Sequence, residues 1–220
     1  MTSTTPTRVR PNAGTKGVAR ADREAQIVEV ACKAFGERGY ANTSVADVAE
    51  AAGISKPLIY NYFGSKEGLH AVCVEHAAAT LWAEFERSSH TDTVGLARAV
   101  LTLDGMFRAL APQPWIWRLV FDPTAPDEGA SHDAFQAYEQ KLFTLGEDGV
   151  SELMRLAGND DHDDTSAMHA VWESVFRSLV NWWLDHPEVS PEEMTARCVR
   201  MFSTAFGPIE GFADPAGTRA

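Results

Sequence analysis

Residues 43–69 have the sequence TSVADVAEAAGISKPLIYNYFGSKEGL. Two short helices are predicted here, because a hydroxyl side chain that can cap a helix precedes each of them, Ser44 or Thr43 for the first and Ser55 for the second. Asp47 follows Ser44 by three residues, as in a capping box. Gly53 lies between the two helices, where a left-handed backbone conformation can turn the chain. This arrangement predicts a helix-turn-helix.

The second of these helices, residues 56–63, has two distinct faces. Ile59 and Phe63 are four residues apart and are expected to point inward. Lys56 and Tyr60, also four apart, share another face and are expected to point outward. An outward helix face with a cation and an aromatic hydroxyl can enter the major groove of duplex DNA, which has about the width of a helix.

The chain on both sides of this motif also has helical periodicity, and no alternating strand pattern competes with it. One helix is predicted from residue 23 to Gly39. After the motif, helices are predicted at about 66–87, 94–110, 115–121, 132–156, 168–185 and 191–206, with an acidic linker at 159–164. We therefore expect an all-α fold of about nine helices, in which a three-helix helix-turn-helix domain precedes a larger helical bundle.

These patterns divide the chain into four parts: a basic arm at 1–20, the helix-turn-helix domain at 21–67, the bundle at 68–207 and a tail at 208–220. The arm and the tail are expected to be disordered. The arm contains no acidic residue and has four basic ones, which are Arg8, Arg10, Lys16 and Arg20. Such an arm can reach a minor groove of DNA or can simply be a solvated tail, and the sequence leaves both possibilities open.

Composition narrows the class of protein. The chain has 220 residues, of which 45% are hydrophobic and 23% charged, so global disorder is excluded. The net charge is −12, yet residues 1–70 contain nine Lys/Arg against seven Asp/Glu, so only this third of the chain suits a nucleic-acid partner. No apolar run approaches the length of a membrane span, and no secretory signal is expected. Three widely separated cysteines favour a reducing cytoplasm.

Enzyme, cofactor and metal chemistry have little support. The chain lacks G-x-S-x-G, H-E-x-x-H, a phosphate loop and a dinucleotide fingerprint. His70, Cys73 and His76 share one wide helical face, but three candidate ligands without further partners favour packing over a metal site. We expect no enzyme activity, no cofactor and no metal.

The run 43–69 closely resembles the DNA-binding domain of the TetR/AcrR family of transcriptional regulators. The preceding Ala34-Phe35-x-x-x-Gly39-Tyr40 is similar to the end of that family's first helix. The sequence departs from the family's common pattern at Leu58 and at Gly68. The resemblance implies that the DNA contacts come from Ser44, Ser55, Lys56, Pro57, Leu58, Tyr60, Asn61, Tyr62 and Lys66, where Ser44 and Lys66 would bind phosphate.

Family members are dimers, and the last two predicted helices have more apolar surface than one core needs. The expected dimer interface comprises Val175, Leu179, Trp182, Trp183, Met194, Cys198, Met201, Phe202 and Ala205. Pairing these helices from two subunits would form a four-helix bundle. It would also place two recognition helices about 34 Å apart, as a palindromic operator requires.

In the family, the middle helices enclose an apolar cavity for a small effector. The corresponding residues here are Trp82, Phe85, Met106, Phe107, Trp117, Arg118, Phe121, His132, Tyr138, Trp172 and Phe176, with Arg118 and His132 as the polar groups that would orient a ligand. Aromatic residues at helical spacing can equally form an ordinary core. The leading interpretation is a homodimeric repressor that a small apolar or aromatic effector releases from DNA. Two alternatives remain: a DNA-binding structural or chromosome-organising factor without an effector, and a small-molecule-binding or enzymatic module with a DNA-binding headpiece.

Overall fold

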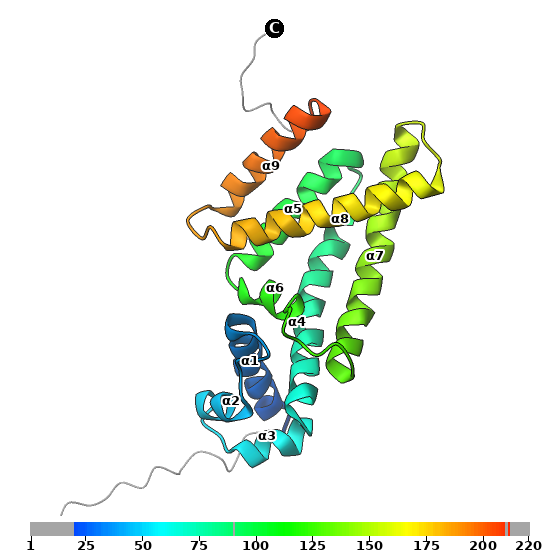
Figure 1. Ribbon diagram of the computed structural model, residues 1–220. Coiled ribbons are helices and arrows are strands. Elements are labelled where there is room, and N and C mark those ends of the chain that lie inside the picture. The colour runs from blue at the N-terminus through cyan, green and yellow to red at the C-terminus, as the bar shows by residue number, and fades with distance from the viewer. Residues whose placement is uncertain (1–19, 90, 210, 212–220) are drawn as a thin grey trace, which may run out of the picture.

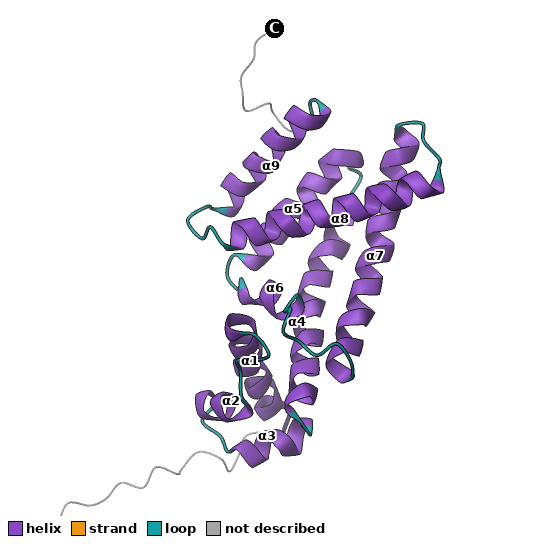
Figure 2. Cartoon of the chain, in the orientation of Figure 1, coloured by secondary structure: helices purple, strands orange, loops and turns teal. Residues whose placement is uncertain are grey.

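The computed structural model describes residues 20–89, 91–209 and 211, and every regular element in them is a helix (Figure 2). The nine helices of these residues are α1 (Arg20–Arg38), α2 (Val45–Ala51), α3 (Lys56–Phe63), α4 (Lys66–Ser89), α5 (Gly95–Leu110), α6 (Trp115–Val120), α7 (Ala130–Leu156), α8 (His162–Leu184) and α9 (Pro191–Phe206). The predicted all-α fold with about nine helices is confirmed. No helix in the described part of the chain is long and apolar enough to cross a membrane.

The N-terminal domain, which we define as α1–α3, is built around a small common core. Ile27 and Phe35 of α1, Val48 of α2 and Ile59 of α3 are all buried. The three helices lie together at one end of the molecule, where α4 begins (Figure 1). Burial of one stripe from each short helix stabilises the domain, because helices of seven and eight residues are marginal alone.

The local signals of the helix-turn-helix act as expected. The Ser44 hydroxyl accepts a hydrogen bond from the Asp47 N–H at 3.2 Å, and the Asp47 carboxylate accepts one from the Ser44 N–H at 3.0 Å. Gly53 adopts a φ of +65° in the turn between α2 and α3. Gly68 has a structural reason as well, because a Cβ there would collide with the carbonyl oxygen of Phe63.

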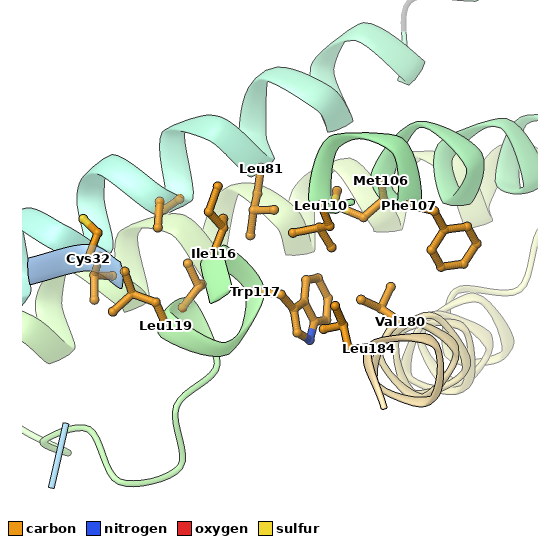
Figure 3. Close-up of a cluster of buried hydrophobic side chains, with 14 of the residues drawn as sticks. Cys32, Leu81, Met106, Phe107, Leu110, Ile116, Trp117, Leu119, Val180 and Leu184 are labelled. Atoms are coloured by element: carbon orange, nitrogen blue, oxygen red, sulfur yellow. The ribbon is translucent and has the colours of Figure 1, made fainter. Parts of the chain in front are cut away.

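The helix α4 continues from the N-terminal domain into the larger bundle, where it lies beside α5, α6 and α7 (Figure 1). One apolar core runs through both parts. Figure 3 shows part of it, with Cys32 of α1 at one end, Leu119 of α6 next to it and Phe107 of α5 at the other end. The short helix α6 therefore connects the N-terminal domain to the bundle through buried side chains.

The start of α8 differs from the sequence prediction. The acidic residues 159–164 were expected to form a linker, but α8 already begins at His162. Asp161 is its N-cap, and its carboxylate accepts hydrogen bonds from the N–H groups of Asp163 and Asp164 at 2.9 and 3.0 Å. Carboxylates stabilise a helix N-terminus through the unpaired N–H groups and the helix dipole. The linker prediction was wrong because it treated a cap as a solvated charge run.

Two terminal residues also lie outside the parts of the chain to which the sequence assigned them. Arg20 is the first residue of α1 and does not belong to an arm. Ile209 is buried in the core, although it follows α9 within the segment expected to be a disordered tail. The other arm residues, Arg8, Arg10 and Lys16, lie outside the described residues.

Candidate nucleic-acid interface

The outer face of α3 presents a cation and a phenol to solvent. Lys56 is exposed, Tyr60 is 41% exposed, and the Lys56 ammonium lies 5.8 Å from the centre of the Tyr60 ring. Ile59, on the opposite face, is completely buried and fixes the rotation of the helix. One side of the helix therefore packs on the core, and the other side is free to enter the major groove of duplex DNA.

The remaining α3 positions divide by exposure. Pro57 and Asn61 are exposed, whereas Leu58 and Tyr62 are half-buried. The exposed Ser55 precedes the helix as its N-cap, but its hydroxyl makes no capping hydrogen bond. That hydroxyl can therefore donate to an external acceptor such as a phosphate oxygen.

The N-terminus of α2 offers another exposed polar group. Ser44 is exposed, and its hydroxyl accepts from the Asp47 N–H, which leaves the hydroxyl proton available to a phosphate. Hydrogen bonds from Ser44 lower the pKa of the Asp47 carboxyl, so this group is charged at neutral pH. A phosphate must therefore approach Ser44 from the side away from that carboxylate.

Arg20 is a basic residue of this surface that sequence reasoning had assigned to the arm. Its guanidinium carbon lies 5.2 Å from the centre of the Tyr62 ring, within the range of a cation–π contact. Arg20 thus adds a positive charge next to α3. Sequence periodicity did not reveal this, because the contact joins the first turn of α1 to a helix forty residues later.

Lys66 is engaged inside the molecule. Its ammonium donates a hydrogen bond to the Tyr40 carbonyl at 2.6 Å and lies 4.0 Å from the centre of the Tyr40 ring. Partial burial lowers the pKa of Lys66, and the negative charge of Asp122 opposes this effect. In this structure the side chain predicted to bind phosphate connects α4 to the loop between α1 and α2, and DNA would have to share it with Tyr40.

A cavity of about 650 Å³ lies in the bundle between α5, α7 and α8, with one wall from α4. Phe85, Trp172 and Phe176 contribute aromatic walls, and an ion pair between Arg98 and Glu152 provides charge at its lining. A smaller cavity of about 200 Å³ adjoins it, and its lining includes Trp117, Phe121 and Phe143. Both cavities share Phe85, Phe176 and His169.

The structure thus divides the residues predicted to line an effector cavity. Phe85, Trp117, Phe121, Trp172 and Phe176 line one cavity or both, whereas Trp82, Met106, Phe107, Arg118, His132 and Tyr138 line neither. Phe107 packs on Trp183, with ring centres 5.2 Å apart, and Arg118 donates to the Leu184 carbonyl at 3.0 Å at the surface. Phe107 and Arg118 are thus engaged within the subunit, and none of the six side chains lines either of these two cavities.

The polar groups of the larger cavity were missed. They include Arg98, Glu152 and His169, and His169 is almost completely buried. Arg98 interrupts the apolar stretch that opens α5, so a charged residue among apolar neighbours was the available signal. Among the described residues, no three His, Cys, Asp or Glu side chains are placed to hold a metal ion.

The residues predicted for a dimer interface differ in their exposure to solvent. Trp182, Met201 and Ala205 are exposed and Val175 is half-buried, whereas Leu179, Trp183, Met194, Cys198 and Phe202 are buried within the subunit. The indole of Trp183, for example, donates to the Val189 carbonyl at 2.8 Å. For the five buried side chains the expectation is corrected, since they form the core that joins α8 and α9 to the rest of the bundle. Val171 and Phe206 are exposed apolar residues of the same two helices that the sequence did not single out.

Parts of the chain are similar in sequence to known proteins. Residues 27–72 match the family described as bacterial regulatory proteins, tetR family. The chain is 35% identical over 65 residues to the HTH-type transcriptional regulator BetI of Burkholderia thailandensis, covering 30% of this chain and 33% of that protein. It is 26% identical over 103 residues to the HTH-type transcriptional activator FasR of Mycolicibacterium smegmatis, covering 47% of each. The matched part thus spans between a third and about half of the length of these relatives.

Solved structures share the fold over most of the chain. A TetR-like transcriptional regulator from Rhodococcus sp. RHA1 has a TM-score of 0.67 at 19% identity, covering 83% of this chain and 94% of that one. FadR from Bacillus subtilis, solved in complex with stearoyl-CoA, has a TM-score of 0.66 at 14% identity, covering 84% and 99%. Residues 27–72 are thus similar in sequence to the tetR family of bacterial regulatory proteins, and most of the chain shares the fold of a TetR-like transcriptional regulator.

Proposed function

We propose that this protein is a homodimeric transcriptional repressor that binds a palindromic DNA operator through α3 and is released by a small apolar or aromatic effector. The observation that carries the proposal is the solvent-facing pair of Lys56 and Tyr60 on a helix fixed from behind by the buried Ile59. In this proposal α3 lies in the major groove. Ser55 precedes this helix and Arg20 contacts its Tyr62 ring, and in this proposal they and Ser44 contact the flanking phosphates.

Dimerisation is supported by apolar side chains left exposed on α8 and α9. Trp182, Met201 and Phe206 are 39%, 48% and 67% exposed, which is unusual for large apolar residues on two adjacent helices. The helix α9 lies at the end of the molecule away from α3 (Figure 1), so a second subunit docked there leaves both recognition helices free. Substituting Met201 by Arg should convert the dimer to a monomer in sedimentation analysis, and an unchanged sedimentation coefficient would contradict the proposed interface.

An effector is supported by the size and lining of the larger cavity. Its volume of about 650 Å³ is in the range of small-molecule sites, and Phe85, Trp172 and Phe176 offer apolar contact. Because a neighbour of the same fold holds stearoyl-CoA, that acyl-CoA is a suitable first probe. If it is an effector, it should lower DNA affinity. The substitution Trp172→Ala should weaken this response more than Trp82→Ala, which removes a tryptophan that lines neither cavity.

The DNA proposal is tested by selection of duplexes from a random library at a fixed salt concentration. The expected result is a two-fold symmetric consensus sequence. In titrations with the selected duplex, Tyr60→Ala should lose about 1–3 kcal/mol of binding free energy and Lys56→Ala a smaller amount if it contacts only phosphate. Lys33→Ala is the matched control, because Lys33 is exposed on α1 and pairs with Glu37.

Two results would overturn this proposal. One is that no duplex is enriched, and the other is that both α3 variants bind like the wild type. The direction of regulation requires a separate assay, because one relative is named an activator. The protein should repress a reporter gene placed downstream of the selected sequence. If the protein instead increases expression of the reporter, it is an activator and not a repressor.

A further inference from the structure

The loop between α6 and α7 holds the main chain that follows α1. The Asp122 carboxylate accepts a hydrogen bond from the Tyr40 N–H at 2.5 Å, and the Thr124 hydroxyl accepts one from the Ala41 N–H at 3.1 Å. Asp122 also accepts bonds from the N–H and the hydroxyl of Thr124, both at 2.8 Å. The two side chains are therefore oriented by each other before they meet the N-terminal domain.

The same main-chain segment is held from a second side. Lys66 of α4 donates to the carbonyl oxygen of Tyr40, whose N–H is bound by Asp122. The Tyr40 N–H thus binds a carboxylate and the Tyr40 carbonyl binds an ammonium group. Hydrogen bonds with one charged partner are about twice as strong as those between neutral groups. The loop between α1 and α2, which leads directly into the helix-turn-helix, is thus bonded to two elements of the bundle.

Close backbone contact makes this attachment specific. Gly39 has a φ of +80°, and a Cβ at this position would lie 3.2 Å from the Thr124 hydroxyl oxygen. At Gly36, three residues earlier, a Cβ would collide with the carbonyl oxygen of Trp115 at the start of α6. Two glycines therefore let the end of α1 approach α6 and the following loop without intervening side chains.

One residue connects this attachment to a cavity. Phe121 immediately precedes Asp122, and its ring lines the smaller cavity. The centres of the Phe121 and Trp117 rings are 4.3 Å apart, and the Arg177 guanidinium carbon lies 4.5 Å from the centre of the Phe121 ring. Because Trp117 and Arg177 pack against this ring, a molecule that enters the cavity and displaces it also pushes on the adjoining backbone that carries Asp122.

From these contacts we propose that Asp122 is a positioning residue that holds the helix-turn-helix in its DNA-binding orientation, and that Phe121 links this hold to the smaller cavity. The inference deepens the proposed function and rests on it for the role in DNA binding. Release of the Tyr40 and Ala41 amides frees the N-terminal domain to turn relative to α4. In a dimer the two recognition helices then lose their fixed spacing.

The hold itself is tested without DNA, by hydrogen exchange at the Tyr40 and Ala41 amides of the full chain. Asp122→Ala should accelerate exchange at these amides about tenfold or more, as expected for loss of a hydrogen bond to a charged acceptor. Asp122→Asn keeps an acceptor oxygen without the charge and should give a smaller increase. Asp127→Ala is the control, because it removes an exposed carboxylate from the same loop and should leave the exchange unchanged. If the amides of α8 exchange in a variant at the same rate as in the wild-type protein, that variant is folded.

The link to the cavity is tested by a second pair of variants. Phe121→Ala should accelerate exchange at Tyr40 and Ala41, whereas Phe143→Ala should not, although Phe143 lines the same cavity from α7. Equal effects of these two variants would refute the link. Unchanged exchange in folded Asp122→Ala would refute the hold.

The role in DNA binding has its own measurement. With the selected duplex, Asp122→Ala should bind about fivefold more weakly or worse, at the lower end of coupling between distant sites, while Asp127→Ala binds like the wild type. Wild-type affinity of Asp122→Ala, together with accelerated exchange, would show that the hold does not position the recognition helix. If the wild-type protein enriches no duplex, the proposed function fails, and the exchange result still decides whether Asp122 holds the loop.

Discussion

His70 should make the stability of this protein depend on pH. The imidazole is completely buried in α4, with the Phe35 and Tyr40 rings at 4.8 and 4.9 Å between centres and the Ser131 hydroxyl 2.6 Å from its Nδ1. Burial lowers the pKa of His70 from 6.5 to about 4, and the negative charge of Asp122 only partly opposes this. Its other ring nitrogen, Nε2, has no hydrogen-bond partner, so the folded protein offers little to a proton there.

The sign and size follow from linkage. Above pH 6.5 the histidine is neutral in both the folded and the unfolded chain, and it does not affect the free energy of unfolding. As the pH falls from 6.5 towards 4, the unfolded chain takes up a proton that the folded chain does not, so stability is lost. Each pH unit well inside this window corresponds to about 1.4 kcal/mol, so this one group should remove about 2 kcal/mol between pH 7 and pH 5.

The measurement is urea unfolding at pH 7, 6 and 5 and at one protein concentration, because dimerisation would couple concentration to stability. The variant His70→Gln cannot titrate in this range, so its loss of stability from pH 7 to pH 5 should be about 2 kcal/mol smaller than that of the wild type. His76→Gln is the matched control, since His76 lies on the same helix but is exposed. If wild type and His70→Gln lose the same free energy over this range, the reasoning from burial is refuted.

Three further predictions concern packing, capping and thiols. Gly36→Ala should destabilise the protein by at least about 2 kcal/mol in urea unfolding, because the new Cβ would collide with the start of α6. Gly149→Ala is the control and should be neutral or stabilising, because only a flexible arginine side chain lies 3.5 Å from its Cβ. Equal effects of the two variants would contradict this prediction. Asp161→Ala should cost about 1 kcal/mol by removing the cap of α8, and Asp160→Ala should have little effect; a neutral Asp161→Ala would show that the cap is not needed. Burial raises the pKa of the Cys198 thiol to about 12, so it should react with a disulfide reagent at neutral pH only after urea is added, and rapid labelling of the folded protein would disprove its burial.

The helix-turn-helix could be read from the sequence because its signals are local. Ser44, Asp47 and Gly53 act on backbone groups within a few residues of themselves, so their roles do not depend on the rest of the fold. Asp161 is equally local, but it lies in a run of acidic residues whose composition is typical of a solvated linker, so the sequence pattern hides its role as a cap. Its carboxylate binds helix N–H groups, and charge composition alone does not reveal such a partner.

The cavities and the exposed apolar surface were decided by tertiary packing. Phe107 and Phe176 both belong to apolar helical stripes, yet one packs on Trp183 in the core and the other lines both cavities. Periodicity gives the buried face of a helix but not its crossing angle or its neighbours, and these determine which side chains meet and where space remains. The hydrogen bond from the Tyr40 N–H to the Asp122 carboxylate joins residues 82 positions apart and depends on the same packing. The amino-acid sequence thus determined the helices and their caps, whereas only the assembled fold determined what lies between them.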